Sequence, residues 1–135
     1  MLEGTVESKG IDMRLRARAQ KRRQPGEMTK TESRYSEVLE AMRLKGEIQE
    51  WAFEPERLVL AKATQYTPDF RVILSDGAVV FVEVKPHGWR KIANQDKGAV
   101  KIKVAAELHP YLFWRATELR QRDGGGFEVE TIERK

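Results

Sequence analysis

The chain has 135 residues, 40% of them hydrophobic and 34% charged, which predicts one soluble globular domain with a single core. The absence of cysteine excludes disulfides, zinc–thiolate sites and thiol catalysis, and two histidines are too few for a multi-histidine metal cage. The net charge of +4 is modest but unevenly placed. Any metal ion is therefore expected to be held by carboxylates, which suits a hard cation such as Mg²⁺.

The first predicted element is a basic N-terminal arm, residues 1–27. Its segment RLRARAQKRR contains six basic residues and no acidic one, which leaves −2 for the rest of the chain. Such a segment favours binding of a polyanion, and a solvated or disordered leader is the alternative. No apolar run has the length of a membrane span or of a signal peptide core, so the expected location is the cytoplasm. The basic residues are Arg14, Arg16, Arg18, Lys21, Arg22 and Arg23.

The domain is expected to occupy residues 28–135 and to begin with a helix in TKTESRYSEVLEAMRLKGEI. Thr29 or Thr31 can cap this helix, and Gly46 lies where helices usually end. Apolar side chains recur near the helical period and predict its buried face: Tyr35, Val38, Leu39, Met42 and Leu44.

Extended chain follows in IQEWAFEPERLVL, with a bend at Pro55. The runs YTPDFRVIL and AVVFVEVK then predict a hairpin, in which Asp76 and Gly77 supply the turn residues with positive φ. Pro86 cannot extend the ladder and marks the end of the second strand.

A second helix is predicted from about Asp96 to Leu108, followed by a short strand in YLFWRAT, a turn in QRDGGG and a last strand in FEVETIE. The core order is αβββαβ, with the last strand after it. This order predicts an α/β fold in which helices flank one mixed β-sheet.

Three charged residues of the hairpin are expected to meet. Asp69 lies early in the first strand, and Glu83 and Lys85 lie near the end of the second. Because the start of one antiparallel strand lies beside the end of its partner, Asp69 and Glu83 can approach each other. Glu83 and Lys85 share one face with Phe81, and a helix should cover that face. The trio is either an ion pair at a sheet edge or two carboxylates that share a divalent ion beside a lysine.

The second interpretation predicts hydrolysis of a phosphodiester. Bound Mg²⁺ lowers the pKa of its water and polarises a phosphate oxygen. The two hairpin carboxylates would supply hard ligands, with the backbone carbonyl of Val84 as a third. The lysine would orient the attacking water and offset developing charge. A fourth ligand is expected from the first helix, where Glu32 is the candidate and Glu37 the weaker substitute.

The motifs PD at 68–69 and EVK at 83–85, on a hairpin after a helix that carries Glu32, resemble the PD-(D/E)XK nuclease superfamily over about residues 28–132. KTESRYSEVLEAMRLKGEI, YTPDFRV, DG…VEVK and AVKIKVAAELHP together resemble small phage and prophage nucleases that are grouped with Holliday-junction-resolving enzymes. YTPDF and VEVKP resemble, more distantly, the N-terminal nuclease domain of TnsA-type transposition endonucleases. The second, winged-helix domain of that group has no counterpart in this sequence.

The resemblance implies a restriction-endonuclease-like core and a homodimer that cuts DNA with Mg²⁺, or with Mn²⁺ as a substitute. The implied substrate is branched DNA, such as a Holliday junction formed in phage replication or recombination. The implied location is then the bacterial host cytoplasm. The implied catalytic set is complete in this sequence: Glu32, Asp69, Glu83 and Lys85.

Further basic residues are candidates for contact with nucleic acid. Lys97, Lys101 and Lys103 lie on the second helix, where phosphate contact and a solvated face are both open. Arg90 and Lys91 follow Trp89 in the loop that leaves the hairpin. Trp89 either stacks on a splayed base or covers the core.

Two other classes of function compete with the nuclease. One is a non-catalytic DNA-binding or packaging-accessory protein that keeps the nuclease fold. The other is a structural or interaction protein with an edge ion pair, which predicts neither metal binding nor salt-dependent affinity for DNA.

Overall fold

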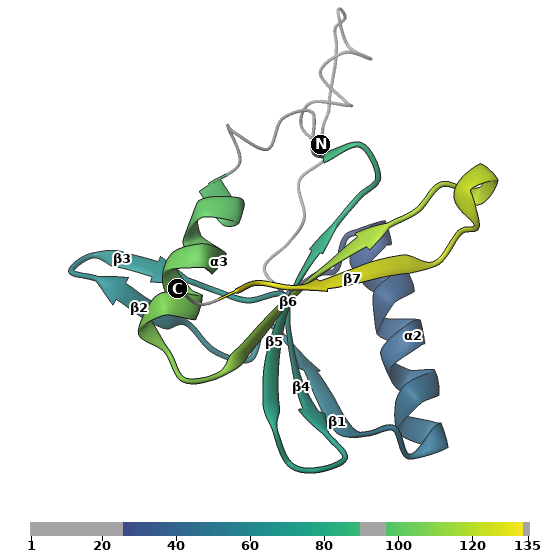
Figure 1. The fold of residues 1–135 in the computed structure, drawn as a ribbon, viewed down its shortest axis with the longest axis horizontal. Coiled ribbons are helices and arrows are strands. Elements are labelled where there is room, and N and C mark those ends of the chain that lie inside the picture. Colours follow the sequence, from purple (N-terminus) through teal and green to yellow (C-terminus); the bar gives the residue numbers. More distant parts are fainter. Residues whose placement is uncertain (1–25, 90–96, 134–135) are drawn as a thin grey trace, which may run out of the picture.

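The computed structural model describes residues 26–89 and 97–133, which form a mixed sheet between two helical layers (Figure 1). The five strands lie in the order β1-β4-β5-β6-β7. Only the β5–β6 pair is parallel in this sheet. The strands are β1 (Ile48–Phe53), β4 (Phe70–Leu74), β5 (Val79–Lys85), β6 (Leu112–Glu118) and β7 (Phe127–Thr131).

Each face of the sheet packs against different elements. Helix α2 (Lys30–Lys45) covers one face, and its Leu39 belongs to the same apolar cluster as Val82 of β5. Helix α3 (Lys97–Leu108) and a hairpin of β2 (Leu58–Ala61) and β3 (Thr64–Tyr66) cover the other face. The alternation along β5 is confirmed, because Phe81 joins the α3 cluster while its neighbours join the α2 cluster. In the part of the chain that is described, no helix is long and apolar enough to cross a membrane.

Helix α2 begins and ends where the sequence predicts. Thr29 is the N-cap, and Gly46 ends the helix in the left-handed conformation with φ of 82°. The predicted buried stripe is only partly right. Tyr35 and Leu39 are buried, but Val38 is 39% and Leu44 72% exposed, because the sheet covers a narrower strip of the helix than its apolar residues span.

The predicted element order is wrong in one place. The chain between β1 and β4 forms the separate two-stranded sheet β2–β3, so the order αβββαβ does not match. The predicted last strand is found as β7, which extends the main sheet after β6. Tyr66 ends β3 and does not begin the hairpin strand, which starts at Phe70. Pro68 interrupts the run between them, because proline cannot donate to a ladder.

The β4–β5 turn also differs from the prediction, in the backbone conformation of Asp76. Gly77 has φ of 92°, but Asp76 is not among the described residues with positive φ. The Asp76 side chain instead accepts a hydrogen bond from the Ala78 N–H at 2.9 Å. The turn therefore needs glycine at one position and a side-chain acceptor at the other.

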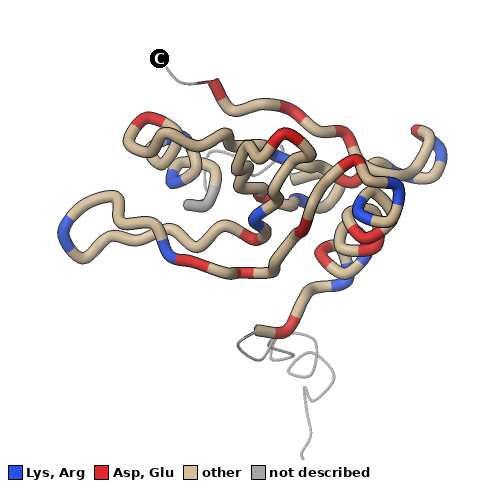
Figure 2. The backbone as a smooth tube through the Cα atoms, turned by 90° about the horizontal axis from the view of Figure 1, so that it is seen from below, with Lys and Arg blue, Asp and Glu red and all other residues tan. Residues whose placement is uncertain are grey.

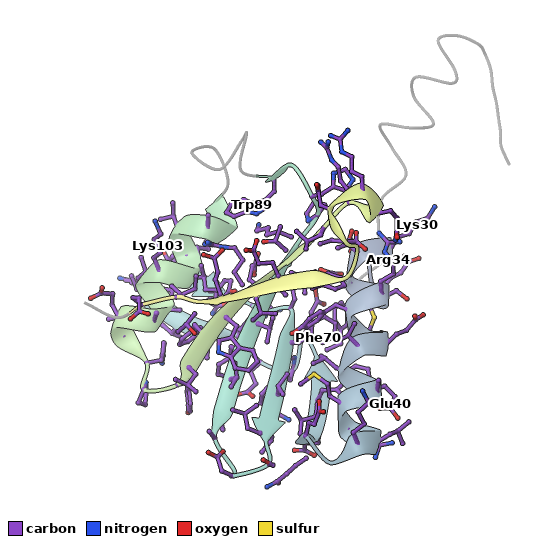
Figure 3. The ribbon with its side chains drawn as sticks, turned by 45° about the vertical axis from the view of Figure 1, so that its right-hand side comes forward. Lys30, Arg34, Glu40, Phe70, Trp89 and Lys103 are labelled. Atoms are coloured by element: carbon purple, nitrogen blue, oxygen red, sulfur yellow. The ribbon has the colours of Figure 1, made fainter. Side chains whose placement is uncertain are left out.

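Glu40 connects α2 to the edge strand β1 and gives a pH-dependent test of that contact. Its carboxylate accepts bonds from Arg43, at 2.6 Å, and from the Trp51 indole, at 3.0 Å. These bonds lower the pKa of Glu40 from 4.5 to about 2. Because the pKa is lower in the folded state, the stabilisation is present above the unfolded value and is lost as pH falls towards about 2. Figure 3 labels Glu40 on α2.

We expect Glu40→Gln to lower the melting temperature at pH 7, with a difference that shrinks as pH falls from 4.5 towards about 2, where the Glu40 carboxyl begins to be protonated in the folded state. Thermal unfolding of the two proteins across this pH range checks the result. A melting-temperature difference that stays constant with pH would show that the Glu40 charge does not support the contact.

Candidate active site

Three segments meet at one end of the sheet. They are the residue before β4, the end of β5 and the first turn of α2. Phe70 pairs with Val82, so Asp69 lies opposite the Glu83–Val84 segment. The Asp69 Oδ2 accepts a hydrogen bond from the Val84 N–H at 2.8 Å. The predicted approach of Asp69 to the end of the second hairpin strand is therefore seen in the structure.

Glu83 and Lys85 form a buried ion pair on the α3 side of the sheet. The Lys85 Nζ lies 3.2 Å from the Glu83 Oε2, and the two residues are 9% and 8% exposed. The other carboxylate oxygen of Glu83 accepts a bond from the Tyr66 hydroxyl at 2.7 Å. Burial and the charge of Glu83 raise the pKa of Tyr66 well above its usual range, which keeps the hydroxyl protonated as the donor.

The Asp69 carboxyl lies in an environment that opposes its negative charge. Burial raises its pKa well above the usual range, and the charge of Glu83 raises it further. The Val84 N–H acts in the opposite direction, and both the charge and a hydrogen bond of Glu32 raise the pKa again. Three carboxyl groups from three segments of the chain therefore interact at one place. A bound cation would offset the repulsion between their negative charges.

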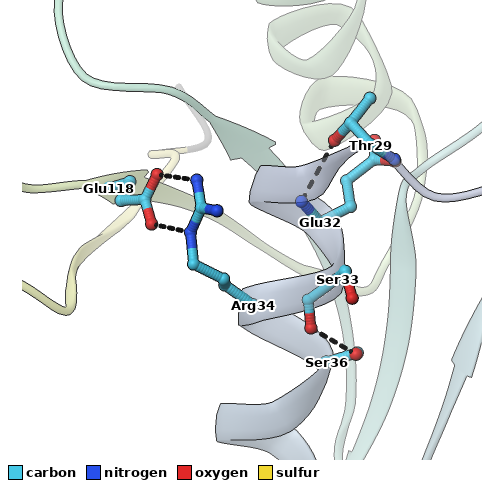
Figure 4. A network of polar contacts seen from close by, with 6 residues as sticks. All are labelled: Thr29, Glu32, Ser33, Arg34, Ser36 and Glu118. Atoms are coloured by element: carbon cyan, nitrogen blue, oxygen red, sulfur yellow. Dashed lines mark hydrogen bonds and ion pairs between the residues drawn. The ribbon is translucent and has the colours of Figure 1, made fainter.

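Glu32 has a second role at the start of α2. The Thr29 N–H donates to the Glu32 Oε1 at 2.9 Å, and the Thr29 hydroxyl accepts from the Glu32 N–H at 3.0 Å (Figure 4). This reciprocal capping box fixes the side chain near the helix terminus. Arg34, one turn along, forms a bidentate ion pair with Glu118 and ties α2 to β6 (Figure 4). Glu37, the weaker candidate, is exposed.

A cavity of about 400 Å³ opens beside this cluster. It is lined by Glu32 and Lys85 and by the loop after β5, including His87 and Trp89. Of the three carboxylates only Glu32 lines this cavity, together with Lys85, so the space adjoins the α2 end of the cluster.

The oxygen donors present fit a hard divalent cation that needs only a few ligands from the protein. Among the described residues, no group of three or more His, Asp or Glu side chains is placed to hold a metal ion together. Mg²⁺ is commonly held by one or two carboxylates and several waters, so Asp69 and Glu83 would suffice. The Val84 N–H points at Asp69, and the carbonyl of a strand residue points to the same side as its N–H, so Val84 C=O is a fitting third donor.

The other predicted contacts with nucleic acid have different outcomes. The Lys101 Nζ donates to the Gln65 carbonyl at 2.9 Å and so holds the β2–β3 hairpin. Lys103 is exposed on α3 (Figure 3). Lys97 begins α3, but its side chain lies outside the described residues. The same is true of the remaining predicted contacts: Arg14, Arg16, Arg18, Lys21, Arg22, Arg23, Arg90 and Lys91.

Trp89 covers buried cations and is 5% exposed. The Lys85 Nζ lies 5.6 Å and the Arg115 Cζ 4.7 Å from the centre of its ring. Both distances allow cation–π attraction. The interpretation of Trp89 as a cover is therefore confirmed for this structure, in which the ring is not exposed for stacking on a base.

Tyr66 and Arg115 are site residues that the sequence motifs missed. Tyr66 stands two positions before the PD pair, but its role as a donor to Glu83 depends on a hairpin that the motif does not describe. Arg115 had a local signal, because it is the one charged residue in the otherwise apolar run YLFWRAT. Register pairs Glu83 with Arg115 across the parallel β5–β6 contact.

Acidic and basic positions are mixed along the described backbone (Figure 2). Residues 26–89 and 97–133 contain 14 Lys and Arg against 17 Asp and Glu, a net charge of −3. The excess positive charge of the chain therefore lies in the segments outside these ranges, chiefly the N-terminal arm.

No protein-family model, no curated protein and no solved structure matches this chain significantly.

Proposed function

We propose that this protein is a Mg²⁺-dependent endodeoxyribonuclease of the PD-(D/E)XK type. One observation carries the proposal: Asp69 interacts with the carboxylates of Glu83 and Glu32 at the end of the sheet, beside the buried ammonium of Lys85. A cluster of carboxylates that oppose one another's charge, with a lysine and an adjoining cavity, supports cation-assisted chemistry on an anion.

The chemistry of each residue suggests its role in the proposed reaction. Asp69 and Glu83, with the Val84 carbonyl, would hold Mg²⁺, and Glu32 would contribute through water or directly. When bound, Mg²⁺ supplies an activated water and charge stabilisation on the phosphate. Lys85 can donate to the attacking water and to a phosphate oxygen while it remains close to Glu83. Water adds at phosphorus, one P–O ester bond breaks, and the leaving oxygen takes up a proton.

The substrate we propose is branched DNA, such as a Holliday junction in phage replication or recombination, and the place of action is the cytoplasm of a bacterial host. The motif resemblance supports this choice. A homodimer would present two sites to two strands of a symmetric junction. Because the described fold is net acidic, the basic arm of residues 14–23 would provide the salt-sensitive affinity.

One observation favours a function without catalysis. Both oxygens of Glu83 already have partners, Tyr66 and Lys85, which is what a purely structural ion pair would show. A non-catalytic DNA-binding or packaging-accessory protein then predicts binding to DNA without cleavage, and a structural or interaction protein predicts neither.

Labelled four-way junction, linear duplex and single-stranded DNA, each incubated with Mg²⁺ and separately with a chelator, separate these functions. We expect cleavage of the junction that requires Mg²⁺. Equal cleavage of all three substrates would retain the nuclease and remove the junction preference. Binding without cleavage would favour the non-catalytic function.

A further inference from the structure

The α3 side of the sheet carries a second group of buried donors next to Lys85. Arg115 and Thr117 lie on β6 and are paired in register with Glu83 and Lys85 of β5. They are 5% and 8% exposed, about as buried as Glu83. The Arg115 Nε and the Thr117 Oγ1 are buried, and neither has a hydrogen-bond partner within residues 26–89 and 97–133.

An unpaired guanidinium N–H is uncommon in a protein interior, because removal from water costs free energy that a hydrogen bond must offset. The one carboxylate paired with Arg115 among the described contacts is Glu130 of β7, at 3.4 Å, the long end of the range for such a bond. The guanidinium is also held under the Trp89 ring. This arrangement fixes the position of the positive charge without using all of its donors.

We propose that the Arg115 guanidinium, with the Thr117 hydroxyl, forms a phosphate-binding subsite that holds a non-bridging oxygen of the substrate phosphate beside Lys85. Adjacent strands are about 4.8 Å apart, so a phosphate that reaches Glu83 and Lys85 is within reach of Arg115. Arg115 is slightly more buried than Glu83, 5% against 8% exposed, so both groups need nearly the same access. Trp89 then covers the cations and limits competition from water. This inference rests on the proposed function in one respect only, namely that the bound phosphate belongs to DNA.

Inorganic phosphate is the probe, and the fluorescence of Trp89 is the readout. Full-length protein is titrated with phosphate in the presence of a chelator, with chloride at matched ionic strength as the reference. We expect a saturable change that chloride does not produce and that Trp89→Phe removes. The latter variant separates the signal from the other two tryptophans of the chain.

Arg115→Gln is expected to weaken phosphate binding by at least about tenfold, the loss of one charge-assisted bond. Arg71→Gln is the matched control, because Arg71 is an arginine of the same sheet, on β4, whose partner is the exposed Glu56. It removes the same charge and should leave phosphate binding unchanged. If Arg115→Gln does not fold, Thr117→Val and Arg115→Lys replace it, and each should weaken binding.

Folded variants that bind phosphate as the wild type does, or a wild type without a phosphate-specific signal, would overturn the subsite. The result is separable from the nuclease test. Phosphate binding that depends on Arg115 in a protein that cleaves no DNA would keep the subsite and remove the nuclease. Conversely, Mg²⁺-dependent cleavage at the wild-type rate by Arg115→Gln would remove the subsite from the reaction.

Discussion

Glu83→Gln is expected to reduce Mg²⁺-dependent cleavage by about 10²–10³-fold, the usual cost of losing one group that stabilises charge in the transition state. The glutamine can still accept the Tyr66 hydroxyl bond, but it carries no charge to hold a cation or to orient Lys85. Affinity for DNA should be retained, because we propose that the basic arm, and not Glu83, supplies that affinity. Cleavage rates and DNA dissociation constants, measured on the same preparations, check both expectations.

The same substitution leaves the Lys85 ammonium buried without its carboxylate, which typically costs about 3–5 kcal/mol of stability. Cleavage must therefore be compared at a temperature where both proteins are folded. The double variant Glu83→Gln, Lys85→Met removes both charges, so it should recover stability without recovering cleavage. Glu128→Gln makes the same chemical change at an exposed position of β7 and should leave activity unchanged. Undiminished cleavage by folded Glu83→Gln would end the metal-site hypothesis.

Mg²⁺ should raise the melting temperature of the wild-type protein, and Asp69→Asn should remove most of that effect. Binding to the folded state alone contributes about 2.7 kcal/mol at a hundredfold excess over Kd. For a chain of this length, that corresponds to roughly 10 °C. When a chelator removes Mg²⁺, the Asp69→Asn variant should melt at a higher temperature than the wild type, because the substitution removes one of three mutually repelling carboxyl groups. This measurement requires no nucleic acid and no cleavage.

Asp76→Asn is the matched control for the metal test. Asp76 accepts the Ala78 N–H at 2.9 Å, much as Asp69 accepts the Val84 N–H at 2.8 Å, and asparagine can keep either bond. Asp76 lies in an exposed turn, so its variant should show the full Mg²⁺ shift. A wild-type melting temperature that does not respond to Mg²⁺, or an equal response from Asp69→Asn, would mean that this cluster binds no cation.

Local chemistry determines much of the fold independently of tertiary contacts. The cap at Thr29, the end of α2 at Gly46, the alternation along β5 and the bounds of α3 follow from short-range rules of hydrogen bonding and side-chain periodicity. The approach of Asp69 to Glu83 also followed from sequence, because hairpin register fixes which strand ends meet.

Tertiary packing decided the rest, because these features depend on contacts between residues distant in sequence. The β2–β3 hairpin leaves the main sheet to cover the Phe81 face, which no local pattern indicates, and it brings Tyr66 to Glu83. The parallel β5–β6 pairing puts Arg115 and Thr117 beside the ion pair, and their register is set by the α3 crossover between the strands. The sequence by itself determined the acids and the lysine of the candidate site. Only the tertiary structure decided which buried donors surround them, because burial and pairing arise when separate strands pack together.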